Sequence, residues 1–149
     1  MTAQSLIISK YGLPTEEYKS KYCEMWEIAQ DFSWASGIMV FGKPLKRIFI
    51  NKDLKKKLIV GFTNLEKAGL HKEIETFDGC YVVRQVRNGK NLSLHSWGMA
   101  IDLNADKERL GQEYTNWSGQ FIGIMKASGL YWGGDWRRKD PMHFALYNG

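Results

Sequence analysis

The chain has 149 residues and a mass of 17.2 kDa, so we expect a single domain over residues 1–149. Hydrophobic residues make up 44% and charged residues 25% of the sequence, which excludes a disordered chain. No apolar stretch approaches the roughly 18 residues that span a bilayer. The start of the chain also lacks the basic and apolar regions of a secretory signal.

The net charge is +5, from 21 basic and 16 acidic residues. This mild excess favours an anionic partner such as nucleic acid, a membrane surface or an acidic cell-wall polymer. A run of three lysines at residues 55–57 is interpreted as a solvated helix face. Cys23 and Cys80 are not part of a Cys-x-x-Cys motif, and without a signal peptide we expect two free, partly buried thiols.

The first half of the chain predicts two helices around a short strand. Residues 14–17 have the composition of a helix start, and apolar residues then recur at helical spacing, at Tyr18, Tyr22, Met25, Trp26 and Ala29. Residues 47–50 predict the strand. A second helix begins after Asn51 or Asp53, carries Leu54, Leu58, Phe62 and Leu65 on one stripe, and ends at Gly69.

The second half is richer in strands. We expect them at residues 81–83, 92–95, 99–103 and 142–147, with a helix over 117–128 that ends at Gly129. Because helices come first and strands cluster late, the order predicts an α+β fold rather than a doubly wound sheet.

Two histidines lie near carboxylates in this strand-rich half. Strand alternation places Ile101 in the core and Asp102 on the opposite face, and a turn at Gly98 brings His95 back toward Asp102. His143 is expected to face away from Met142 and Phe144, which point into the core.

Two imidazoles and one carboxylate suit a catalytic zinc ion, because a fourth position stays open for water. Asp140 precedes His143 by three residues and is placed to exchange a proton with that water. The alternative is that these histidines are hydrogen-bonded residues of the core or surface, which is how we interpret His71. By composition alone, residues 132–136 form a turn between core aromatics.

Three ordered motifs carry a family resemblance: Ser-x-His-x-x-Gly-x-Ala-x-Asp at residues 93–102, Trp-Gly-Gly-Asp-Trp at 132–136, and Asp-Pro-Met-His-Phe at 140–144. Together they resemble the zinc D-alanyl-D-alanine carboxypeptidase family, which includes phage and bacterial L-alanyl-D-glutamate endopeptidases. The resemblance covers residues from about 79 to 149. It implies a DD-peptidase-like (hedgehog-like) α+β domain whose small antiparallel sheet, with helices packed on it, carries one Zn²⁺.

The resemblance also implies roles for particular residues. His95, Asp102 and His143 would be the zinc ligands, and Asp140 the general acid and base. An arginine that polarises the scissile carbonyl would be Arg84, with Arg87 as the alternative. Ser93 and Trp97 would support the ligands; Asp135 would either do the same or stabilise its turn. Trp136 would line the substrate cleft.

The function expected from these features is hydrolysis of an amide bond in the stem peptide of bacterial peptidoglycan, as a monomer. An L-alanyl-D-glutamate endopeptidase of phage origin is favoured, made in the host cytoplasm and acting on the cell wall as a lysis or virion enzyme. The alternatives are a D-alanyl-D-alanine carboxypeptidase and a catalytically silent module that binds cell wall or nucleic acid. Residues 137–139, beside Trp136, are the one basic and aromatic cluster that would suit nucleic acid, but they adjoin the expected site and would instead attract an acidic stem peptide. The complete set of His95, Asp102, His143 and Asp140 disfavours a silent module, so we expect no nucleic-acid partner and no membrane insertion.

Overall fold

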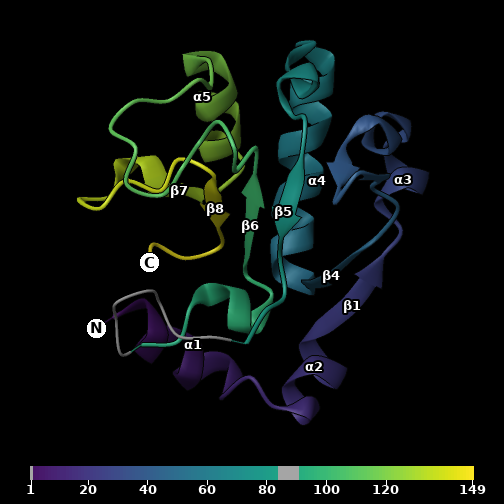
Figure 1. Cartoon of the computed structure of the whole chain (residues 1–149). Coiled ribbons are helices and arrows are strands. Elements are labelled where there is room, and N and C mark those ends of the chain that lie inside the picture. The colour runs from purple at the N-terminus through teal and green to yellow at the C-terminus, as the bar shows by residue number, and fades with distance from the viewer. Residues whose placement is uncertain (1, 84–90) are drawn as a thin grey trace.

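The computed structural model of the protein describes residues 2–83 and 91–149. Its largest sheet is antiparallel, with the strand order β5-β6-β8-β7 (Figure 1). The strands of this sheet are β5 (Phe77–Gly79), β6 (Ala100–Leu103), β8 (His143–Ala145) and β7 (Tyr131–Trp132). Two further antiparallel pairs join β1 (Cys23–Trp26) to β4 (Ile48–Asn51) and β2 (Met39–Val40) to β3 (Lys43–Pro44).

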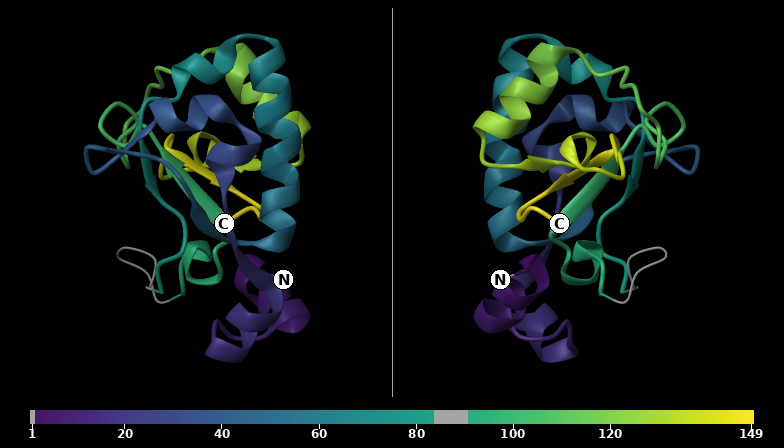
Figure 2. Two further views of the ribbon diagram at one scale, coloured as in Figure 1. Left: turned by 90° about the vertical axis from the view of Figure 1, so that its right-hand side faces the viewer. Right: turned by 90° about the vertical axis from the view of Figure 1, so that its left-hand side faces the viewer.

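The helices gather at two ends of the molecule. Figures 1 and 2 show α4 and α5 side by side against the sheet, and α1 and α2 together at the other end. The α-helices are α1 (Ala3–Tyr11), α2 (Glu16–Tyr22), α3 (Ile28–Asp31), α4 (Lys52–Lys67) and α5 (Gly119–Ala127). Short 3₁₀ turns are η1 (Ser33–Gly37), η2 (Leu70–Glu73), η3 (Leu94–Trp97) and η4 (Gly133–Asp135).

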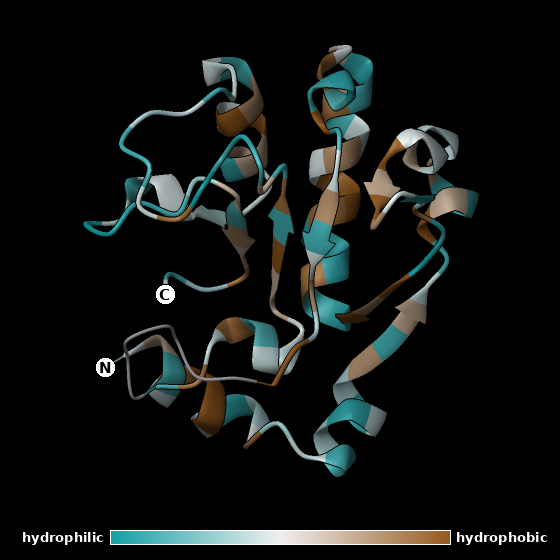
Figure 3. Cartoon of the chain, viewed as in Figure 1, coloured by the Kyte–Doolittle hydropathy of each residue, from teal (hydrophilic) through white to brown (hydrophobic). Residues whose placement is uncertain are grey.

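Helix α4 forms as its sequence predicts. The Asn51 side chain caps it by accepting hydrogen bonds from the backbone N–H groups of Asp53 and Leu54. The predicted apolar stripe is buried, whereas polar residues cover the opposite face, so the helix carries both brown and teal bands in Figure 3. The chain leaves the helix through Gly69, whose φ of 73° is the left-handed conformation that favours glycine.

Two apolar clusters hold the fold together. The larger one packs α4 and α5 on the sheet and includes Leu58, Phe121, Ile101 and Phe144. The smaller one joins α1 and α2 to η3 and the nearby ends of β6 and β8. Its members are Ile7, Tyr11, Tyr18, Cys23, Leu94, Trp97, Met99, Ala100 and Ala145.

The helix predicted to run to Ala29 is wrong. Helix α2 ends at Tyr22, and the chain continues as β1, which pairs with β4. Burial then follows strand alternation, since Met25 is 53% exposed and Trp26 only 2%. Pairing with a partner distant in sequence has overridden the local helical spacing.

Two predicted strands are also wrong. Residues 81–83 are irregular, because the strand of this region lies earlier, at β5. Residues 92–95 do not form a strand either, since His95 belongs to the 3₁₀ turn η3. Met142 was predicted to face the core, but it lines a cavity. It lies just before the last strand, which is shorter than predicted and begins at His143.

The architecture confirms the predicted α+β class with a small antiparallel sheet and helices packed on it. The extent of one domain over residues 1–149 stays a prediction. In the described ranges, 2–83 and 91–149, no helix has the length and apolarity needed to cross a membrane.

Candidate metal centre and its cleft

His95 is held by a short turn rather than by a strand. The Ser93 hydroxyl begins η3 by accepting a hydrogen bond from the His95 backbone N–H at 3.3 Å. Gly98 ends the turn with a φ of 65°, and its N–H donates to the His95 carbonyl at 3.0 Å. The Val82 N–H donates to that same carbonyl at 2.9 Å. These hydrogen bonds fix the backbone position from which the His95 side chain projects.

Asp102 and His143 come from two neighbouring strands of the sheet. They are direct register partners in the antiparallel pair of β6 and β8. Ile101 and Leu103 are buried in the larger apolar cluster, so Asp102 points to the other face of β6, as strand alternation predicts. The sheet therefore places an imidazole and a carboxylate next to each other on one surface.

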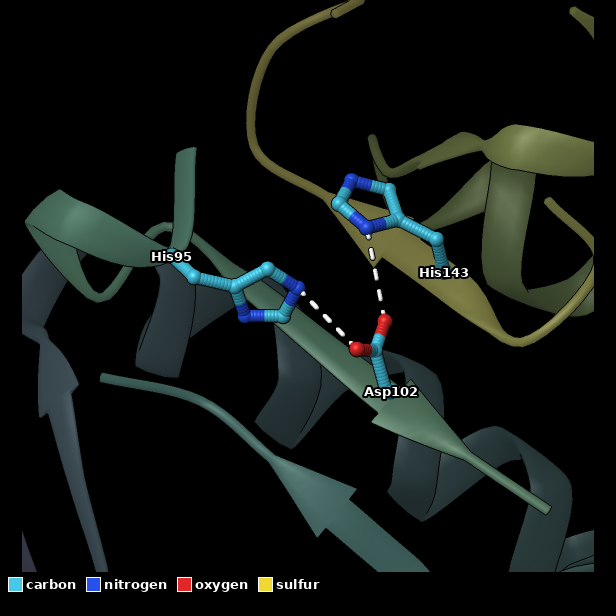
Figure 4. A group of neighbouring side chains, drawn as sticks. All are labelled: His95, Asp102 and His143. Carbon is cyan, nitrogen blue, oxygen red and sulfur yellow. Dashed lines mark ion pairs between the residues drawn. The ribbon is translucent and has the colours of Figure 1, made fainter. Parts of the chain in front are cut away.

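The three side chains converge on one point, with the two imidazoles on either side of the carboxylate (Figure 4). His95 Nε2 lies 3.2 Å from Asp102 Oδ2, and His143 Nδ1 lies 3.4 Å from Asp102 Oδ1. One ligand atom from each residue lies within 4.8 Å of the other two. Both histidines are buried, and Asp102 is nearly so. No other group of three potential metal ligands within the described ranges meets this criterion.

The hydrogen bonding of His95 is the observation that favours a cation. Its Nδ1 lies 2.8 Å from the backbone carbonyl oxygen of Cys80, which accepts only, so Nδ1 carries the proton. In the neutral ring Nε2 is then a lone-pair atom, and it faces a carboxylate oxygen that is also an acceptor. His95 Nε2 and Asp102 Oδ1 are buried and have no hydrogen-bond partner in the described structure. A bound cation satisfies both atoms, which is the arrangement of a metal site with its second-layer hydrogen bond.

The electrostatics of Asp102 agree with a charged ligand. Burial by itself raises the pKa of Asp102, but hydrogen bonds from His143 and His95, and the positive charge of these rings when they are protonated, outweigh burial and hold that pKa well below its ordinary value. A cation bound in place of those protons favours the ionised carboxylate in the same way.

Asp140 stands beside this trio, with its Oδ2 3.8 Å from His143 Nδ1. The backbone of Asp140 packs closely against η4, where the Asp140 N–H donates to the Gly133 carbonyl at 2.9 Å. A Cβ on Gly133 would lie only 2.3 Å from the Asp140 carbonyl oxygen and 3.1 Å from His143 Cβ. The first glycine of the Trp-Gly-Gly-Asp-Trp motif is thus required for close backbone packing next to the site.

Two tryptophans hold the segment between Asp140 and His143. The indole N–H groups of Trp117 and Trp132 both donate to the Pro141 carbonyl, at 2.9 and 2.8 Å. Both rings also contact the larger apolar cluster. The aromatic residues around this segment therefore link the position of His143 to the core.

The site opens into a cavity of about 460 Å³. His95, Asp102, Asp140 and His143 all line it. Its remaining wall is Ser93, Leu94, Leu110, Trp136, Arg137, Arg138, Met142 and Gly149. Trp136 packs its ring centroid 4.9 Å from that of His143, and its indole N–H donates to Asn148 Oδ1. A peptide-sized ligand fits a cavity of this volume, with apolar surface around a polar centre.

Three residues expected to support the ligands have other partners. Ser93 binds the backbone of His95 rather than its ring. Trp97 is fully buried in the smaller cluster, where its indole N–H donates to the Gly12 carbonyl. Asp135 is exposed and pairs with Lys126 at 2.6 Å. The partner of His95, the carbonyl of Cys80, was missed, because a backbone oxygen has no signature in the sequence.

The predicted arginines, Arg84 and Arg87, lie outside the described residues. His71 packs beside Trp34 and is not one of the three converging side chains. Its Nδ1 is buried without a hydrogen-bond partner in the described structure, so the hydrogen bond expected for this ring is not observed there. Cys23 and Cys80 are free and buried, which confirms the expected thiols.

Residues 87–146 match the model of a protein family described as D-alanyl-D-alanine carboxypeptidase. The match confirms the resemblance inferred from the three motifs. It spans the whole converging trio, Asp140 and the Trp-Gly-Gly-Asp-Trp segment.

Proposed function

We propose that the protein is a zinc-dependent peptidase of bacterial peptidoglycan, because residues 87–146 match the model of the D-alanyl-D-alanine carboxypeptidase family. The substrate is the stem peptide, and the favoured bond is the L-alanyl-D-glutamate amide. The observation that carries the proposal is that two buried acceptors, His95 Nε2 and Asp102 Oδ1, have no hydrogen-bond partner in the described structure.

His95 Nε2, Asp102 and His143 Nδ1 are the atoms that would hold the ion. A zinc ion in such a site supplies Lewis acidity, which polarises the scissile carbonyl and acidifies water. The Cys80 carbonyl keeps the proton of His95 on Nδ1, so the lone pair of Nε2 stays available to bind the metal.

Asp140 moves the proton in this proposal. Its carboxylate lines the cavity beside His143, so it accepts a proton from the attacking water and delivers it to the departing amine nitrogen. Trp136 forms an apolar wall next to the reacting centre and limits water there. Arg84, or Arg87 in its place, remains predicted from the resemblance to stabilise the developing oxyanion.

The function is tested by incubating the zinc-loaded protein with purified muropeptides and weighing the products. Cleavage after L-alanine identifies the endopeptidase, whereas loss of one terminal D-alanine identifies the carboxypeptidase alternative. A chelator control must abolish either reaction. Intact muropeptides after incubation with the zinc-loaded protein would refute the proposal and favour a silent binding module.

The proposed setting is the cell wall of a bacterium infected by a phage. The protein would be made in the host cytoplasm and reach its substrate on lysis or as a virion component. A basic sequence with a net charge of +5 favours adsorption to the acidic wall.

A further inference from the structure

The cavity carries a cation that the proposed chemistry does not use. Arg137 lines the cavity together with Asp140 and His143, and it is exposed at the surface. Among the described residues it takes part in no ion pair or hydrogen bond, whereas its neighbour Arg138 already interacts with another group. Within ranges 2–83 and 91–149, Arg137 is therefore the cavity guanidinium available to a ligand.

The position of Arg137 in the chain assigns it to one side of the substrate. Asp140 delivers a proton to the amine that leaves, so the leaving half of the substrate lies along the segment that carries Asp140. Arg137 precedes Asp140 by three residues in that segment, and both line the same cavity. A group recognised by Arg137 thus belongs to the residue whose nitrogen is released.

Both candidate substrates carry a carboxylate on the residue whose nitrogen is released. In a D-alanyl-D-alanine terminus, the released residue carries the terminal carboxylate on its Cα. In the L-alanyl-D-glutamate bond, the D-glutamate continues the chain through its side-chain carboxyl group, so its α-carboxylate is free. In each case the carboxylate is attached to the same carbon as the leaving nitrogen.

We propose that Arg137 binds the α-carboxylate of the leaving residue and selects substrates in which this group is ionised over those in which it is amidated. Guanidinium and carboxylate match in charge and in the geometry of paired hydrogen bonds. This inference rests on the proposed peptidase function and adds the substrate feature that the site selects. Arg137 acts on binding and takes no part in proton transfer.

The test compares two synthetic stem peptides that differ in one group: L-Ala-γ-D-Glu-L-Lys and its D-isoglutamine counterpart, which carries an α-carboxamide. Wild-type protein is expected to show a kcat/KM about 10-fold higher for the carboxylate peptide, a modest factor because Arg137 is exposed to solvent. Arg137→Gln removes the preference by lowering kcat/KM for the carboxylate peptide alone, mainly through KM. Lys46→Gln, the same loss of charge at an exposed residue outside the cavity, keeps it.

A binding measurement separates this inference from the proposed function. Calorimetric titration of both peptides into zinc-loaded Asp140→Asn protein reports recognition without turnover, and zinc content is checked for every variant. Tighter binding of the carboxylate peptide that disappears in the Asp140→Asn/Arg137→Gln double variant supports the inference, even if wild-type protein cleaves neither peptide and the proposed function fails. Equal binding and equal cleavage of the two peptides overturn the inference and leave the peptidase function standing.

Discussion

Asp102 and His143 are direct partners across β6 and β8, and their side chains meet with His143 Nδ1 3.4 Å from Asp102 Oδ1. Strand register places the two proposed ligands opposite each other in the central pair of strands of the main sheet. His95 joins them from a turn whose backbone is hydrogen-bonded on both sides. Strand register and backbone hydrogen bonds, neither of which involves a metal, therefore position the three side chains, which reduces the ordering cost of binding an ion.

Replacing Asp140 separates proton transfer from metal binding. Asp140→Asn should retain about one zinc per chain and lose turnover by about 10²- to 10⁴-fold, because an amide cannot accept the proton of water. Activity assays and elemental analysis on the same sample check this. Asp135→Asn, at the exposed partner of Lys126, is the matched control and should keep full turnover. A fully active Asp140→Asn protein would assign the base to another carboxylate.

The glycine of η4 is predicted to be sterically required. Gly133→Ala would push a methyl group against the Asp140 carbonyl and His143, lowering the free energy of unfolding by about 1–3 kcal/mol and weakening zinc binding. Gly123→Ala is the control, since that glycine lies in α5 with open space around its Cβ position; it should stabilise the protein by about 0.5–1 kcal/mol. Denaturant unfolding and zinc titration measure both. A Gly133→Ala protein as stable as wild type would contradict the packing argument.

Trp97 is predicted to be structural. Trp97→Phe removes a buried indole N–H that donates to the Gly12 carbonyl, so we expect the free energy of unfolding to fall by about 1–3 kcal/mol. Zinc affinity of the folded protein should stay within about 3-fold, because the ring lies in the smaller apolar cluster rather than beside a ligand. A large loss of zinc affinity at unchanged stability would restore the role first expected from the motif.

The two cysteines should be unreactive in the folded protein. Burial raises the pKa of Cys23, and more strongly that of Cys80, so both stay as neutral thiols at pH 8. Alkylation followed by mass spectrometry should be at least about 100-fold slower than in urea, because modification requires opening of the structure. Rapid labelling of either thiol in native buffer, or a disulfide on a non-reducing gel, would contradict this.

Much of the candidate site could be predicted from the sequence because its residues obey local rules. The alternation around Asp102 and the capping of α4 by Asn51 depend only on near neighbours, and both are observed. The extra length predicted for the helix that ends at Tyr22 is different, since only the distant strand β4 draws residues 23–26 into a sheet. Local spacing carries no information about that partner.

The parts that sequence could not supply are contacts made by backbone atoms and by packing. The Cys80 carbonyl orients His95, yet any residue at that position offers a carbonyl. The glycine at position 133 was predicted as part of a turn, whereas its role is the close approach of two backbone segments. The helix over residues 3–11 was not predicted, because its stability comes from burying Ile7 and Tyr11 against a distant part of the chain.

The central claim is that His95, Asp102 and His143 form one zinc site. Its most direct test is elemental analysis after reconstitution with zinc and removal of excess, for wild-type protein and for Asp102→Asn and His143→Ala. A single three-ligand site should hold about one zinc per wild-type chain and lose most of it in both variants, with circular dichroism confirming that they are folded. Wild-type protein that retains no zinc, or folded ligand variants that retain it fully, would show that these three residues do not form a zinc site.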